Sequence, residues 1–214
     1  MWAVAKQAYC NRETFIAGIY ASLMNMAVAI FGAVMGQLYL MQRLDVSQES
    51  AAFVNGMLFL GAMLGGPLIG WWSDQLGSRL LPMKYGALIS CVLIGLVLYA
   101  PISITGMAIL FFLLGFTTSS QVISFAFVAE KSSPLVVASS ISLVSILLQG
   151  GYILYQNMFS YVLVHGGNMH MINHVPVYSY EAYQSAVLIL PISFLLALGC
   201  VFFLKEARKP RQIL

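Results

Sequence analysis

Six long stretches of this sequence contain almost no charged residue, and this pattern points to a chain embedded in a membrane. They cover residues 14–39, 51–72, 82–100, 106–129, 137–164 and 183–204. A helix needs about 20 apolar residues to cross the hydrocarbon core of a bilayer. Only 8% of the residues are charged, whereas soluble domains carry about 25%. The sequence therefore predicts an all-α, polytopic membrane protein, a bundle of six transmembrane helices.

Lysine and arginine concentrate on one side of the predicted spans. The side that holds the N-terminus carries Lys6, Arg12, Arg79, Lys84, Lys131, Lys205, Arg208, Lys209 and Arg211, and the other side carries Arg43. Because cytoplasmic loops are rich in these residues, both termini are expected in the cytoplasm, most simply of a bacterial inner membrane. Residues 1–13 form a cytoplasmic N-terminal segment, 14–204 the transmembrane domain and 205–214 a cytoplasmic tail.

Several functional classes are disfavoured by the same residues. The basic residues lie at span ends and form no single patch, which argues against nucleic-acid binding. No Asp, Glu, Lys or Arg lies in the middle of a span, which argues against an intramembrane enzyme and against a proton relay. The longest outer loop holds His165, His170 and His174, but their spacing fits no compact zinc pattern. We interpret it as an ordinary loop, and no metal or cofactor is expected.

Uncharged polar residues lie at a similar depth on three predicted spans. Within about two helical turns of the midplane are Asn25, Thr117, Gln121, Gln149 and Tyr152. Such residues either bond neighbouring helices together or line a polar cavity that binds a solute. Helix packing is the simpler interpretation for each residue alone, whereas the set on three helices favours a substrate cavity. In the second span, Gly61, Gly65, Gly66 and Gly70 have the spacing of a helix-packing face.

One motif joins the second and third spans. Gly70, Asp74, Gly77 and Arg79 resemble the conserved cytoplasmic loop of the major facilitator superfamily, although Gln75 and Ser78 stand where that family usually has basic residues. Gly77 suits a tight turn, and Asp74 suits the amides of a helix N-terminus. Arg79 is expected to pair with Glu130. The resemblance implies a cytoplasmic gate, and the alternative is a solvated hairpin.

The resemblance also implies an architecture and a function. The family has twelve spans in two halves, and this chain resembles the second half because its motif is degenerate, its fourth span lacks an arginine and its tail is basic. Spans one and four would line the cavity, and spans two and five would face the other half. We expect transport of a small solute by alternating access, together with a second six-helix unit that is either a separate chain or another copy. The absence of charges in the middle of the spans fits either a neutral solute or a second half that carries the charge-handling groups. The alternatives are a membrane scaffold and an inactive, truncated fragment.

Overall fold

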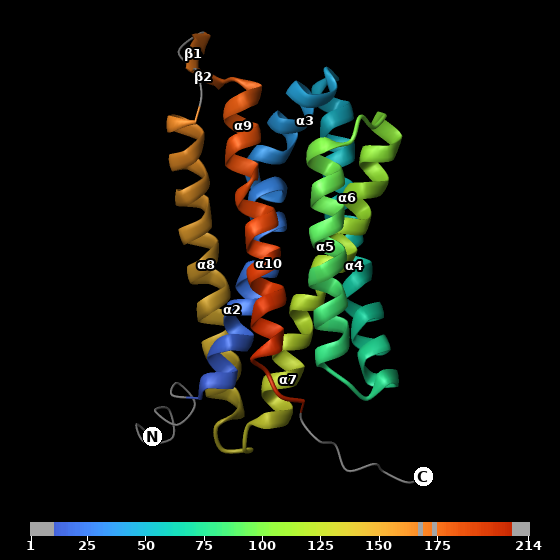
Figure 1. The fold of residues 1–214 in the computed structure, drawn as a ribbon, viewed down its shortest axis with the longest axis vertical. Coiled ribbons are helices and arrows are strands. Elements are labelled where there is room, and N and C mark those ends of the chain that lie inside the picture. Colours follow the sequence, from blue (N-terminus) through green and yellow to red (C-terminus); the bar gives the residue numbers. More distant parts are fainter. Residues whose placement is uncertain (1–10, 167–168, 173–174, 207–214) are drawn as a thin grey trace.

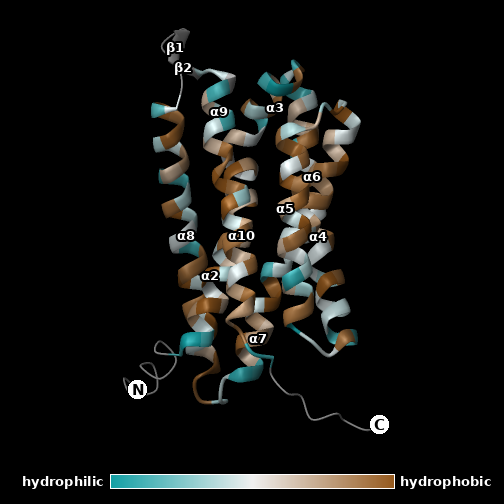
Figure 2. Cartoon of the chain, viewed as in Figure 1, coloured by the Kyte–Doolittle hydropathy of each residue, from teal (hydrophilic) through white to brown (hydrophobic). Residues whose placement is uncertain are grey.

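The computed structural model describes residues 11–166, 169–172 and 175–206. Within these residues, six helices are long and apolar enough to cross a membrane, which confirms the predicted all-α bundle. The six helices run roughly side by side (Figure 1), and hydrophobic residues dominate them between their ends (Figure 2). We call the end that holds Arg12, Gly77 and Glu206 the base, and the end that holds strands β1 and β2 the hairpin end.

The elements follow one another along the chain in a simple up-and-down order. The first three spans consist of α2 (Arg12–Ala27), η1 (Val28–Met35), α3 (Gly36–Leu44), α4 (Gln48–Leu76) and α5 (Leu80–Tyr99). The fourth and fifth consist of α6 (Ile104–Thr118), η2 (Ser119–Val122), α7 (Ile123–Lys131) and α8 (Val137–His165). The strands β1 (Met169–Ile172) and β2 (Val175–Tyr178) precede α9 (Tyr180–Val187) and α10 (Ile189–Phe202).

Polar side chains at the span ends set where several helices begin. The side chain of Asn11 accepts hydrogen bonds from the backbone of Glu13 and Thr14 at the start of α2. Ser47 and Ser103 cap α4 and α6 in the same way. Such caps satisfy backbone amides that have no partner within the helix. They lie at the edges of the apolar stretches, which is why sequence patterning located the spans well.

Two spans expected to be continuous α-helices are interrupted near the middle of their length. The first changes from α-helix to a π-helix, η1, and the fourth contains the 3-10 turn η2. Glycines make room for the wider π turns: a Cβ on Gly32 would lie 2.7 Å from the Phe59 ring of α4, and one on Gly36 would overlap the Phe31 carbonyl. Breaks of this kind often accompany functional positions.

The packing leaves two helices largely uncovered. The segment α2 contacts both α8 and α10, α10 contacts α5, and α4 contacts α6. The fraction of each span's most apolar window that is buried is 67% in the first span, but only 28% in the second and 17% in the fifth. Spans two and five therefore present open faces within this chain.

The loop between α8 and α9 is more structured than the sequence indicated. Residues expected to form an ordinary loop include the antiparallel pair β1–β2, with His170 opposite Val177. His165 ends α8, its ring stacked on Tyr161 at 4.3 Å between centroids. No group of three or more metal-ligating side chains occurs in the described parts of the chain. His174 lies outside the described residues.

Candidate functional site

Asn25 and Gln121 meet in the middle of the bundle. The side-chain nitrogen of Gln121 lies 3.2 Å from the Asn25 Oδ1 atom and donates to it, and both residues are half-buried. Asn25 lies three residues before the π segment, and Gln121 belongs to the 3-10 turn. The Gln121 Oε1 atom is buried and has no hydrogen-bond partner among the described residues. A buried amide oxygen without a partner is costly, so this pair offers an acceptor to an incoming donor.

Gln149 and Tyr152 lie on the open face of α8. Gln149 is exposed and Tyr152 is half-buried. The structure shows no hydrogen bond from either side chain to another described helix, so they do not serve as helix-to-helix contacts within this chain. Polar groups that face hydrocarbon cost several kcal/mol each. Their side of α8 therefore has to meet water, a solute or more protein.

The hydroxyl group of Thr117, another predicted substrate residue, is engaged with α5. Its hydroxyl group lies 2.8 Å from that of Ser90 on α5, and it also donates to the Leu114 carbonyl at 3.2 Å. The side chain is only 8% exposed. Thr117 therefore joins α6 to α5, as the packing interpretation of polar residues describes.

Some glycines of α4 and α6 lie where the two helices pack together, and others lie on the open face of α4. A Cβ on Gly61 would overlap the Phe112 carbonyl of α6, and one on Gly115 would overlap the Leu58 carbonyl of α4. Close contact between α4 and α6 thus depends on these glycines. The predicted packing role is confirmed for Gly61 and for Gly65, whose added Cβ would lie 2.5 Å from the Phe116 carbonyl oxygen, whereas Gly115 was not among the predicted positions. In contrast, a Cβ on Gly66 or Gly70 would meet nothing within 4 Å.

The motif residues form an ionic cluster at the base. Gly77 adopts φ +61° and ends α4, as its predicted role in a tight turn requires. Arg79 pairs with Glu130 at 2.5 Å and with Asp74 at 2.7 Å. The expected Arg79–Glu130 contact is thus present, and its hydrogen bond raises the pKa of Arg79 above its usual value, against the opposing effect of burial. Asp74 pairs with Arg79 and does not cap a helix, contrary to the sequence-based expectation.

Glu206 caps the third span in place of Asp74. Its carboxylate oxygens accept from the backbone N–H groups of Arg79 at 2.8 Å and Leu80 at 3.2 Å. They also accept from the hydroxyl group of Ser78 at 2.6 Å. A carboxylate is stabilised there by the positive end of the helix dipole. Sequence reasoning missed this role because nothing in the tail shows which helix end lies beside it.

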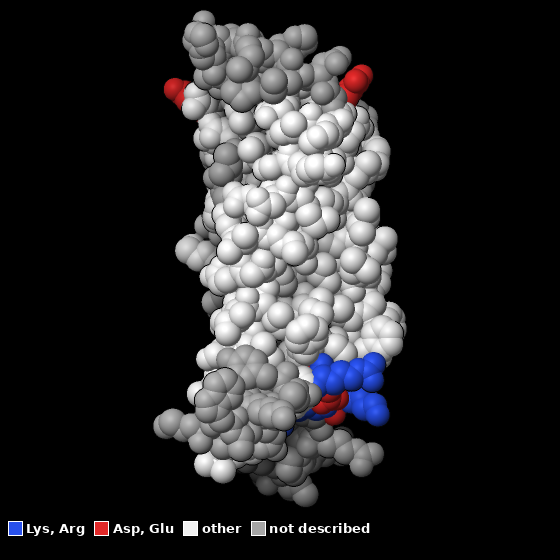
Figure 3. All heavy atoms as spheres, turned by 90° about the vertical axis from the view of Figure 1, so that its left-hand side faces the viewer, with Lys and Arg blue, Asp and Glu red and all other residues white. Residues whose placement is uncertain are grey.

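A third ion pair at the base joins the first and fourth spans. Lys131, at the end of α7, donates to Glu13 in the first turn of α2 at 2.6 Å. Figure 3 shows Lys and Arg near the base of one face, while the described residues of its middle carry no charge. Together with the cluster around Arg79, this pair fastens the base ends of several spans into one unit.

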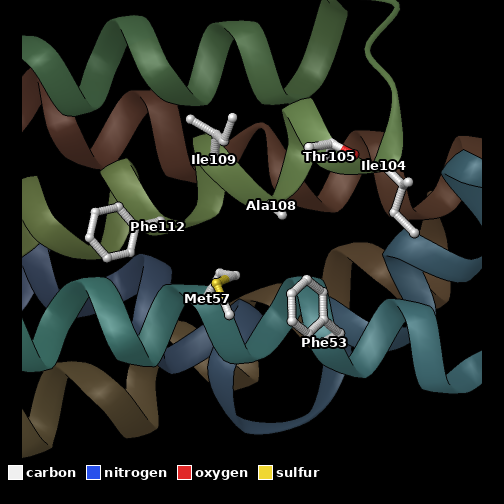
Figure 4. Close-up of a pocket in the computed structure, with 7 residues that line it drawn as sticks. All are labelled: Phe53, Met57, Ile104, Thr105, Ala108, Ile109 and Phe112. Carbon is white, nitrogen blue, oxygen red and sulfur yellow. The ribbon is translucent and has the colours of Figure 1, made fainter.

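Two cavities differ in character. One, of about 340 Å³, lies between α4 and α6 (Figure 4), where Phe53 and Met57 lie opposite Ala108. Thr105 gives it little polar surface, so it suits a lipid chain better than a polar solute. The other, of about 290 Å³, lies between η1 and α8 and is lined in part by Gln156 and Asn157.

Six apolar helices, two of them largely uncovered, with an ionic cluster at the base, define a polytopic α-helical membrane protein. The profile of the Major Facilitator Superfamily matches residues 17–214. The chain belongs to this superfamily of membrane transporters, and its six apolar helices fit one half-domain. No curated protein shows significant sequence similarity to the chain.

Proposed function

We propose that this chain carries a small, uncharged solute across the membrane by alternating access, as one six-helix half of a transporter. The observation that supports this most is the exposure of α8, whose most apolar window is only 17% buried although Gln149 projects from its open face. A polar residue at mid-depth is compatible with the bilayer only where water, solute or protein covers it. A central pathway beside a second half would provide that cover.

The substrate pathway would be lined by spans one, four and five. Asn25 and Gln121 contribute a bonded pair with a free acceptor, and Gln149 and Tyr152 contribute the facing polar groups. No charged side chain lies among them, so an ion would lose its hydration without a compensating charge. This favours an uncharged solute. Thr117 is left out because its hydroxyl group is engaged with α5.

The partner would be a second six-helix unit set against α4 and α8. Either another copy of this chain or a separately made half would cover the open glycines Gly66 and Gly70. The chain resembles the second half more than the first because its motif is degenerate. We place the base, which holds most of the described lysines and arginines, on the cytoplasmic side of a bacterial inner membrane.

Solute uptake by sealed membrane vesicles that contain the protein tests the proposal. Gln121→Ala removes both the bond to Asn25 and the free acceptor, so uptake of a panel of radiolabelled sugars and polyols should fall about tenfold, as for the loss of one good polar contact. Gln75→Ala, at the exposed end of α4, is the matched control and should transport normally. Equal uptake by both variants at equal abundance would refute the role of this site.

A non-transporting scaffold is the second candidate, and the close glycine contacts between α4 and α6 favour it. In that case, neither Gln121→Ala nor Gln149→Ala would alter solute movement, while the assembled complex would remain intact on a sizing column. A transporter predicts the same intact complex but impaired uptake.

A further inference from the structure

The cavity between η1 and α8 has one polar and one apolar wall. Gln156, Asn157 and Ser160 of α8 supply the polar wall, and Ala29, Ile30 and Met35 of η1 supply the apolar wall opposite. The centre of α8 falls near residue 151. At about 1.5 Å per residue, Gln156 lies about 7 Å and Ser160 about 13 Å towards the hairpin end. The cavity therefore lies inside a hydrocarbon core that extends about 15 Å from its midplane.

The polar wall keeps much of its hydrogen-bonding capacity free. Asn157 donates to the Ile153 carbonyl of its own helix at 2.8 Å. For Gln156 and Ser160, the described structure shows no side-chain hydrogen bond. Free amide and hydroxyl groups at this depth are unfavourable against lipid, so they require a polar occupant.

The opposite wall is held in shape by α4. The π segment contacts both α4 and α8. Behind it, the Phe59 ring lies close to Gly32, and the Asn55 side chain lies close to Gly36. Larger residues at either glycine would push the segment away from α4. A wall supported in this way is preformed, which reduces the entropy lost when a ligand binds.

We propose that this cavity binds an uncharged, hydroxyl-bearing solute on its way between the outside and the Asn25–Gln121 pair. Amide and hydroxyl side chains both donate and accept, as solute hydroxyl groups do. The described lining residues carry no charge, so an ion would be desolvated without a counter-charge from them. At about 30 Å³ per water molecule, the cavity holds a solute of about ten heavy atoms. The inference rests on the proposed transport function.

Thiol labelling tests whether water reaches the cavity. In a chain whose Cys10, Cys91 and Cys200 are replaced by alanine, Gln156→Cys is exposed to a membrane-impermeant thiol reagent. Leu154→Cys is the matched control, because it lies within about 3 Å in depth but roughly on the opposite side of the helix. The cavity cysteine should react about tenfold faster than the one that faces lipid. Equal rates would overturn the proposal.

Solute protection tests the chemistry of the cavity. Xylitol, an uncharged polyol of about ten heavy atoms, should slow the labelling of Gln156→Cys about threefold at twice its Kd. Xylonate, a carboxylate of similar size, should give no protection. Labelling that neither xylitol nor glucose slows, or that xylonate slows equally, would overturn the proposal. If this assay fails while Gln121→Ala still lowers uptake about tenfold, the transport function stands and only the cavity assignment falls.

Discussion

Glu206 provides a direct test of how the base of the bundle is held together. The carboxylate accepts two backbone N–H groups at the start of α5 and the Ser78 hydroxyl group. Glu206→Ala removes all three acceptor contacts, whereas Glu206→Gln keeps an oxygen and loses the charge. The two variants therefore separate hydrogen bonding from electrostatics at one helix end.

The expected loss can be estimated from these contacts. Losing a side-chain acceptor at a helix N-terminus costs about 0.5–2 kcal/mol, and the charge in the dipole contributes about 0.3–1 kcal/mol. Because Glu206 is solvent-exposed, screening favours the lower part of both ranges. We expect about 1–2 kcal/mol for Glu206→Ala and about 0.5 kcal/mol for Glu206→Gln. At about 2–4 °C per kcal/mol, Glu206→Ala lowers Tm by about 4 °C.

Thermal unfolding of the purified chain in detergent measures the loss of Tm for each variant. Lys205→Ala is the control, because it alters the neighbouring tail residue while leaving the cap intact. The expected order of Tm loss is Glu206→Ala, then Glu206→Gln, then Lys205→Ala with almost no change. A Glu206→Ala variant as stable as Lys205→Ala would refute the capping role. A Gln variant as unstable as the Ala variant would assign the effect to charge alone.

Substitutions of glycines and of Arg43 probe the packing and the hairpin end. Gly115→Ala forces a methyl group onto the α4 backbone and should lower the free energy of unfolding by about 1–3 kcal/mol. Gly95→Ala has no neighbour within 4 Å, so it should be neutral or stabilising by up to about 1 kcal/mol. Thermal unfolding compares the two variants, and an equal loss of stability would contradict the close contact. Arg43 donates to the last carbonyls of α5, so Arg43→Ala should lower stability by about 1–2 kcal/mol, and Arg43→Lys by less because it keeps the charge. Chemical unfolding of both variants checks this, and a wild-type midpoint for Arg43→Ala would rule it out.

Sequence patterning located the spans and one contact because each depends on local chemistry. Charge-free stretches need no tertiary information to predict membrane spans. The turn at Gly77 was predictable because a left-handed residue at a helix end favours glycine. The Arg79–Glu130 pair was predictable because both charges lie at the same end of neighbouring spans, where few alternative partners exist.

The other contacts could not be predicted from the sequence. They depend on how each helix is rotated about its axis and on which segments, distant in sequence, lie side by side. Thr117 and Gln121 are four residues apart and similar in depth, yet one engages α5 and the other engages α2. Depth along a helix can be counted from sequence, but the neighbour that a side chain faces depends on how six helices assemble. The π segment was missed because its residues are as apolar as those of an α-helix. The capping role of Glu206 was missed because the residue is far from α5 in the sequence.

The contacts of Arg79 bear on how the base behaves during transport. Its carboxylate partners in the described structure, Asp74 and Glu130, belong to the same six-helix unit, as does the cap from Glu206. Breaking such contacts in each cycle would leave a largely buried guanidinium without its counter-charges, at a cost of about 3–5 kcal/mol. We therefore expect the cluster to act as a permanent brace, so that the unit moves as a rigid body.

Spin labels on Gln75→Cys and Lys205→Cys, in the chain without native cysteines, test this brace. Both positions are exposed and flank the cluster, so labels should not disturb it. The distance between them, measured by pulsed electron resonance, should keep a single distribution with and without xylitol, because a rigid six-helix unit rotates without internal change. Arg79→Ala should broaden the distribution, which shows that the assay detects a loosened base. A solute-dependent second distance in the unmutated cluster would mean that the contacts open in each cycle, as a gate requires.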